Sequence, residues 1–147
     1  MEWIFLHACL CLKQGWFNTI VSRWKSAFND LHGMTGFHTT TYNDPDLGES
    51  FAKYLTDTWG PYPIGEAWKK ATIRELRKYG RGIYAAVYRI VIYKWEDLPG
   101  GGGTRRQVYD YWYDYLPGYG AGIEKDPSEW GGYPYESGFR YSKWECY

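Results

Sequence analysis

Hydrophobic positions follow two different periods along the first part of the chain. Residues 3–12 (WIFLHACLCL) are almost continuously apolar, a pattern typical of a strand buried on both faces in a parallel sheet. From Phe17 to Leu31 the apolar residues recur at helical spacing, which predicts an amphipathic helix ending near Gly33. The short, threonine-rich stretch 34–41 predicts a strand that runs into a loop.

The following segment predicts two more helices and a strand. Residues 47–58 and about 64–79 have helical periodicity, and the sequence Trp59-Gly-Pro-Tyr-Pro separates them. Residues 83–95 are rich in β-branched and aromatic side chains and give the clearest strand pattern. The resulting order of strand, helix, strand, helix, helix and strand favours an α/β fold with a mainly parallel sheet.

The pattern changes after residue 97. Residues 99–103 (PGGGG) indicate a flexible loop, and residues 107–147 are rich in Tyr, Trp and Gly with little helical periodicity. Residues 138–147 alternate well enough to predict a closing strand. We expect one domain over residues 1–147, with an α/β part at 1–97 and an aromatic extension at 98–147 that forms an irregular layer.

The charge balance excludes several classes of partner. The 147 residues carry 17 Lys+Arg and 17 Asp+Glu, and residues 1–78 hold nine basic and eight acidic side chains, so neither half is basic. We therefore expect no nucleic-acid binding and no polybasic membrane anchor. No apolar run is long enough for a membrane span. Aromatic residues make up 21% of the chain, which suits a core, an interface or a sugar-binding face equally well.

The three cysteines, Cys9, Cys11 and Cys146, are too few and odd in number for a disulfide framework. One bridge from Cys146 to either of the other two is compatible with the sequence. The apolar run is preceded by Glu2 rather than by the basic residues of a signal peptide, so no export signal is visible.

A set of short segments resembles a known family. The cysteine of Ala8-Cys9 lies in a hydrophobic strand, as the nucleophile does in caspase/haemoglobinase-type (clan CD) peptidases. The chain is most similar to an uncharacterised prokaryotic family of caspase-like domains of unknown function. The similarity covers about residues 9–127 and is carried by HACLCL, the run from Trp24 to Phe37, Ala67-Trp68 with Ala71, Asp114-Tyr-Leu-Pro-Gly-Tyr-Gly and Asp126-Pro127.

This resemblance implies a caspase-like, mainly parallel sheet flanked by helices. In the peptidases a His-Gly block lies on the strand before the cysteine strand, but here His32-Gly33 follows Cys9. The resemblance therefore implies a fold that is truncated on its N-terminal side.

The candidate catalytic residues are Cys9 as a nucleophile and His38 or His32 as its base. A reactive cysteine needs a base or a positive field to form the thiolate. His38 leaves the strand next to that of Cys9 and is the better placed of the two. His7, Cys9 and Cys11 share one face of a strand, but such neighbours project in parallel and do not converge on one ion. We expect no metal site and, because Gly100–Gly103 lacks the Gly-Lys-Ser/Thr ending, no phosphate loop or other cofactor site.

The leading functional hypothesis is a non-catalytic structural or interaction module. A long apolar edge strand at residues 3–12 would aggregate if it were left bare. We expect it to be covered within a homo-oligomer, a polymer or a complex with a chain that supplies the missing strands. The alternatives are a cysteine hydrolase that uses Cys9 and a carbohydrate-binding module that uses Trp and Tyr faces. The resemblance and the aromatic composition favour an extracellular or cell-surface location.

Overall fold

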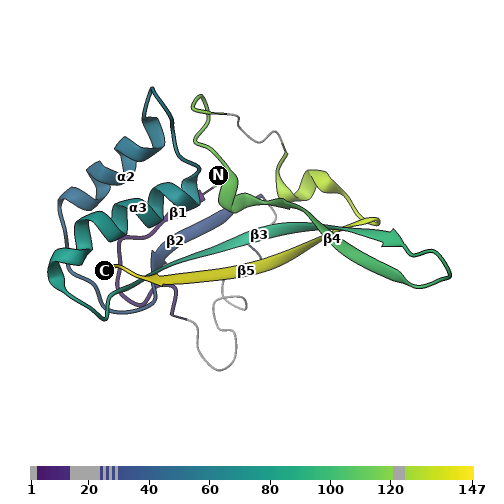
Figure 1. The fold of residues 1–147 in the computed structure, drawn as a ribbon, viewed down its shortest axis with the longest axis horizontal. Coiled ribbons are helices and arrows are strands. Elements are labelled where there is room, and N and C mark those ends of the chain that lie inside the picture. Colours follow the sequence, from purple (N-terminus) through teal and green to yellow (C-terminus); the bar gives the residue numbers. More distant parts are fainter. Residues whose placement is uncertain (1–2, 14–23, 25, 27, 29, 121–124) are drawn as a thin grey trace.

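The computed structural model describes residues 3–13, 24, 26, 28, 30–120 and 125–147. These residues form a mixed five-stranded sheet and two helices that pack against each other (Figure 1). The strands are β1 (Trp3–Phe5), β2 (Gly33–Phe37), β3 (Tyr84–Asp97), β4 (Gly103–Asp110) and β5 (Tyr135–Glu145); the helices are α2 (Asp46–Thr56) and α3 (Ile64–Leu76). Short 3₁₀ turns lie at Arg77–Tyr79, Tyr111–Tyr113 and Pro127–Trp130.

Strand β3 is the centre of the sheet. On one side it pairs antiparallel with β2 along its first half and with β4 along its second half. On the other side β5 pairs antiparallel with it in one unbroken register from Tyr84–Glu145 to Lys94–Tyr135. The second half of β3 and the strand β4 project beyond the helices as a long hairpin (Figure 1).

The expectation of a mainly parallel, caspase-like sheet flanked by helices is wrong. Only β1 and β2 run parallel, whereas β3 is antiparallel to β2, β4 and β5. Two helices separate β2 from β3, and the second returns the chain to the end of β2, where the N–H of His38 donates to the carbonyl oxygen of Tyr84 at 2.9 Å. Strand β3 must therefore run back along β2.

The expected irregular C-terminal layer is also corrected, because two of the five strands, β4 and β5, come from residues 98–147. Aromatic side chains fit a pleated sheet well, which explains why this aromatic segment forms strands. Strand β5 begins at Tyr135, three residues before the strand predicted at 138–147. The expected helix between Phe17 and Leu31 lies largely outside the described residues.

The predicted strand 3–12 is reduced to the three residues of β1. Beyond Phe5 the chain still follows β2, but it turns at Leu10, whose φ is +58°. The N–H groups of Leu10 and Leu12 donate to the carbonyl oxygens of Thr39 and Phe37. These apolar residues therefore follow the neighbouring strand without forming a regular ladder.

The helices predicted at 47–58 and 64–79 are confirmed as α2 and as α3 with its terminal 3₁₀ turn. The apolar residues Ala67, Trp68, Ala71 and Leu76 of α3 are all buried. Helix α3 covers one face of the sheet, where the indole of Trp144 donates to Thr72. Phe28 packs on the other face against Tyr88 and Phe139. Within the described residues, no helix combines the length and apolarity needed to cross a membrane.

Candidate functional site

Cys9 is exposed and lies beside the segment that follows β2. Its Sγ accepts a hydrogen bond from the N–H of Thr41 at 3.2 Å and lies 3.4 Å from the carbonyl oxygen of the same residue.

The other two cysteines are less accessible, and all three are free thiols. Cys11 is half-buried, and its Sγ accepts a hydrogen bond from the N–H of Phe37 at 3.3 Å. Burial raises the pKa of the Cys11 thiol, and burial likewise raises the pKa of Cys146. A raised pKa keeps these two thiols protonated at neutral pH, so neither is primed as a nucleophile.

The imidazole of His38 lies against β5. Its Nδ1 is 2.8 Å from the hydroxyl of Tyr141, which in turn donates to the carbonyl oxygen of Leu12 at 2.9 Å. Because that hydroxyl has one proton and gives it to Leu12, the hydrogen of the imidazole is assigned to Nδ1. Burial, Lys143 and Lys13 lower the pKa of His38, so the ring is neutral at neutral pH.

His32 is buried at the opposite end of β2 from Cys9. Its Nδ1 is 2.6 Å from Asp114 and its Nε2 is 2.8 Å from Asp126, and the indole of Trp3 also donates to Asp114. These contacts connect β1 and the start of β2 to the C-terminal half of the chain. His32 is thus held between two carboxylates.

The three candidate catalytic residues are therefore not gathered into one site. The contacts described for Cys9 are with Thr41, while His38 contacts Tyr141 and His32 contacts two carboxylates. In the sequence, the partners Asp114 and Asp126 are notable only because they belong to the segments that carry the family resemblance. No local signal linked them to a histidine more than 80 residues away.

One cluster of carboxylates, Asp44, Asp46 and Glu75, has the spacing of metal ligands among the described residues. Asp44 already binds Lys78 at 2.6 Å and the Tyr79 hydroxyl at 2.9 Å. Burial alone would raise the pKa of Asp44, but these two hydrogen bonds bring it below its usual range. The cluster thus contains its own cation.

The exposed edge of β5 is the feature that best suits an interaction. The N–H of Trp95 donates to the carbonyl oxygen of Pro134 and the N–H of Cys146 donates to that of Ile83, each at 2.8 Å. Backbone groups alternate in direction along an antiparallel strand. Even-numbered residues of β5 therefore point their backbone groups at β3, and odd-numbered residues point theirs away from it.

We define the β5 edge as the outward N–H and C=O groups of five residues: Ser137, Phe139, Tyr141, Lys143 and Glu145. Within the described part of the chain, no hydrogen bond reaches these backbone groups. The ladder with β3 contains no bulge over this length, so the edge is regular. A regular open edge is a template for pairing with another strand.

Comparison with known proteins gives a family but no function. The family model of a domain of unknown function, DUF6345, matches residues 1–120. Neither the curated proteins nor the solved structures contain a match.

Proposed function

The chain belongs to the DUF6345 family of domains of unknown function, and we propose that it is a non-catalytic interaction module that pairs with a second copy of itself through the β5 edge. The observation that carries this proposal is the row of outward backbone groups on five alternate residues of β5, which no described residue pairs with. Strand addition at such an edge satisfies backbone groups that otherwise depend on water.

Pairing of two identical antiparallel edges suits a two-fold dimer. In such an interface each copy offers the same strand, and each outward N–H finds an outward C=O of the partner. The four charged side chains of β5 are Glu136, Arg140, Lys143 and Glu145, so the strand has no net charge. Two copies therefore do not repel each other through this strand.

Aromatic residues of β5 add contact area beside the backbone pairing. Phe139 is 37% exposed, and Tyr135 and Trp144 are half-buried. Aromatic cross-strand pairs contribute about 0.2–1 kcal/mol each. This expectation replaces the predicted edge at residues 3–12, because β1 is only three residues long.

Light scattering coupled to size exclusion tests the proposal at micromolar concentration. The chain has a mass of 17.3 kDa, and we expect about twice that value, falling toward the monomer on dilution. A mass of one chain at every concentration would rule out the proposed pairing.

A matched pair of variants at Ser137 locates the interface. Ser137→Pro removes one outward N–H while leaving the hydrogen bonds to β3 in place, and proline is tolerated on edge strands. Ser137→Ala retains that N–H. We expect the proline variant to dissociate at a higher concentration than both the wild type and Ser137→Ala. Equal dissociation of the two variants would contradict pairing through β5.

The cysteine-hydrolase alternative has one observation in its favour, the exposed Cys9 thiol with its hydrogen bond from Thr41. Within this hypothesis the base is His38, His32 after a rearrangement, or a residue of a partner chain.

The carbohydrate-binding alternative relies on exposed aromatics such as Trp59, which is 98% exposed, and predicts sugar-dependent tryptophan fluorescence.

A further inference from the structure

The cationic residues of this neutral chain are concentrated on one helix. Residues 69–81 contain six of the 17 Lys and Arg residues, and Glu75 is the only carboxylate among them. The 13 residues cover α3 from Lys69 onward, the following 3₁₀ turn and Arg81. The even division of charge between the two halves of the sequence conceals this cluster, because acidic residues elsewhere in the chain balance it.

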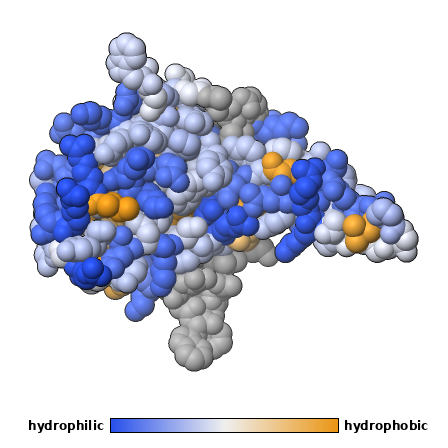
Figure 2. Space-filling model, in the orientation of Figure 1, coloured by the Kyte–Doolittle hydropathy of each residue, from blue (hydrophilic) through white to orange (hydrophobic). Residues whose placement is uncertain are grey.

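Four of these cations line a groove of about 700 Å³ on the outer side of α3: Lys69, Lys70, Arg74 and Arg77. We call it the α3 groove. Its wall also includes Tyr54 from α2 and Ile73, both half-buried. Figure 2 shows strongly hydrophilic residues around a small apolar patch over α3. The groove therefore combines positive charge with a limited apolar and aromatic surface.

Most of this charge is not neutralised by the residues that the structure describes. In the described part of the chain, no carboxylate forms an ion pair with Lys69, Lys70 or Arg77, and Arg74 pairs only with its neighbour Glu75. The ammonium group of Lys70 lies 4.6 Å from the ring centre of Tyr62. By contrast, Lys78 of the same helical end is already bound to Asp44.

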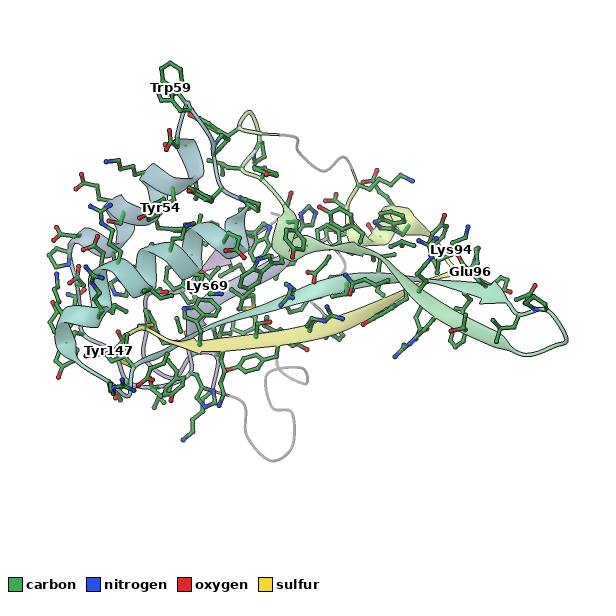
Figure 3. All side chains as sticks on the ribbon, in the orientation of Figure 1. Tyr54, Trp59, Lys69, Lys94, Glu96 and Tyr147 are labelled. Atoms are coloured by element: carbon green, nitrogen blue, oxygen red, sulfur yellow. The ribbon has the colours of Figure 1, made fainter. Side chains whose placement is uncertain are left out.

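The groove continues at both ends into smaller hollows that share its residues. Arg74 and Arg77 also line a hollow with Tyr147, and Lys69 also lines one with Trp112 and Trp144. Figure 3 shows Tyr54, Lys69 and Tyr147 at the helical end of the molecule, away from Lys94 and Glu96 on the hairpin. A ligand that extends along α3 would thus meet both cations and aromatic rings.

We propose that the α3 groove binds an acidic, extended peptide segment of a partner protein. In an extended chain every second side chain lies on the same face, about 6.6 Å apart. Successive turns of a helix are 5.4 Å apart, which is near this spacing, so carboxylates at alternate positions can reach the long cationic side chains on successive turns. The apolar side chains between them contact Ile73 and Tyr54.

Two observations favour a peptide over a nucleic acid. Glu66 belongs to the lining of the groove, and Glu75 lies beside Arg74. A nucleic acid, with a negative charge on every nucleotide, would meet both carboxylates, whereas a peptide can place neutral residues opposite them. The zero net charge of the chain also supplies no long-range attraction for a polyanion. This site is separate from the β5 edge and does not depend on the proposed function.

Fluorescence anisotropy tests the proposal with a short labelled peptide that has glutamate at every second position and leucine or serine between. We expect binding that weakens as salt is added, because these charges are exposed. Lys69→Glu and Arg77→Glu should each weaken binding about tenfold or more. Lys94→Glu, which places the same change on the hairpin, should leave the affinity unchanged.

The outcomes separate the possibilities. An absence of peptide binding, or equal binding by Lys69→Glu and Lys94→Glu, would overturn the proposal. Tighter binding of a single-stranded oligodeoxythymidine than of the peptide would reject the acidic peptide in favour of a nucleic acid. Thermal unfolding of each variant shows that it is folded, and repeating the titration with Ser137→Pro distinguishes a failure of this site from a failure of the β5 edge.

Discussion

Arg89 and Asp110 form a two-point ion pair in the interior of the protein. The Nε and Nη2 atoms of Arg89 donate to the two carboxylate oxygens of Asp110 at 2.5 and 3.0 Å, and both side chains are buried. The guanidinium also lies 4.9 Å from the ring centre of Trp112. This pair fixes the end of β4 against the middle of β3.

Loss of either partner should be strongly destabilising. Asp110→Ala leaves a buried guanidinium without its carboxylate, and we expect the free energy of unfolding to fall by about 3–5 kcal/mol. The exposed pair of Glu96 and Arg106 is a matched control, since Glu96→Ala should cost about 0–1 kcal/mol. Urea denaturation measures both, and similar losses would show that burial does not determine the strength of the first pair.

Protonation of the Asp44 carboxylate should account for part of the stability that the protein loses in acid. Its pKa in the folded protein is lowered by hydrogen bonds from Lys78 and Tyr79. Its contribution to stability is therefore fully present above the unfolded pKa of about 3.9 and is lost as the pH falls through the folded value. Denaturation at a series of acidic pH values should show a smaller loss for Asp44→Asn than for the wild type. The exposed Asp97 provides the control, because Asp97→Asn should keep the wild-type profile.

Substitution by alanine should have opposite effects on stability at two glycines in the helices. A Cβ at Gly65, in the first turn of α3, would lie 2.3 Å from the indole of Trp112, whereas a Cβ at Gly48 in α2 would meet nothing within 4 Å. We expect Gly65→Ala to destabilise the protein by about 1–3 kcal/mol. Gly48→Ala should stabilise it by up to about 1 kcal/mol, because alanine favours the helix. A gain in melting temperature for Gly65→Ala would contradict the close packing described here.

The three cysteines should react in order of exposure. Iodoacetamide treatment of the native protein, read by mass spectrometry, should label Cys9 first and Cys11 more slowly, with a rate that rises only at alkaline pH because the pKa of Cys11 is raised. Cys146 should react only after unfolding. Labelling of Cys9 as fast in mildly acidic as in alkaline solution would indicate a base beside it and favour the hydrolase alternative. Labelling of Cys146 before Cys9 would contradict the described burial.

The helices and the central strand could be predicted because their signals are local. The apolar positions of α3 lie on one face, and β3 is a long run of β-branched and aromatic residues. Strand β4 gave no such signal, because Thr104, Arg105, Arg106 and Gln107 are all exposed and polar. The direction of pairing was missed for a related reason, since it depends on where two successive helices return the chain.

The candidate sites were harder to predict because each depends on contacts between distant segments. Cys9, His38 and His32 have chemistry suitable for catalysis, but only the fold shows that β2 separates His32 from Cys9. Among the described strands, β5 pairs only with β3, so its other side is an edge. The two strands lie about 50 residues apart in the sequence, and no local pattern predicts that they pair. The sequence contains the cationic residues of α3, but only the structure shows that they line one groove.

The central position of β3 has a consequence for how the protein is made. Strand β3 ends at Asp97, and β5, which pairs with it from Tyr84 to Lys94, begins only at Tyr135. During synthesis on the ribosome, β3 therefore emerges and waits with one side unpaired until β5 follows. Distant strand pairing of this kind is slow to form, and an apolar strand left open in the meantime can associate with other nascent chains. The efficiency of biosynthesis should thus depend on how soon β5 reaches β3.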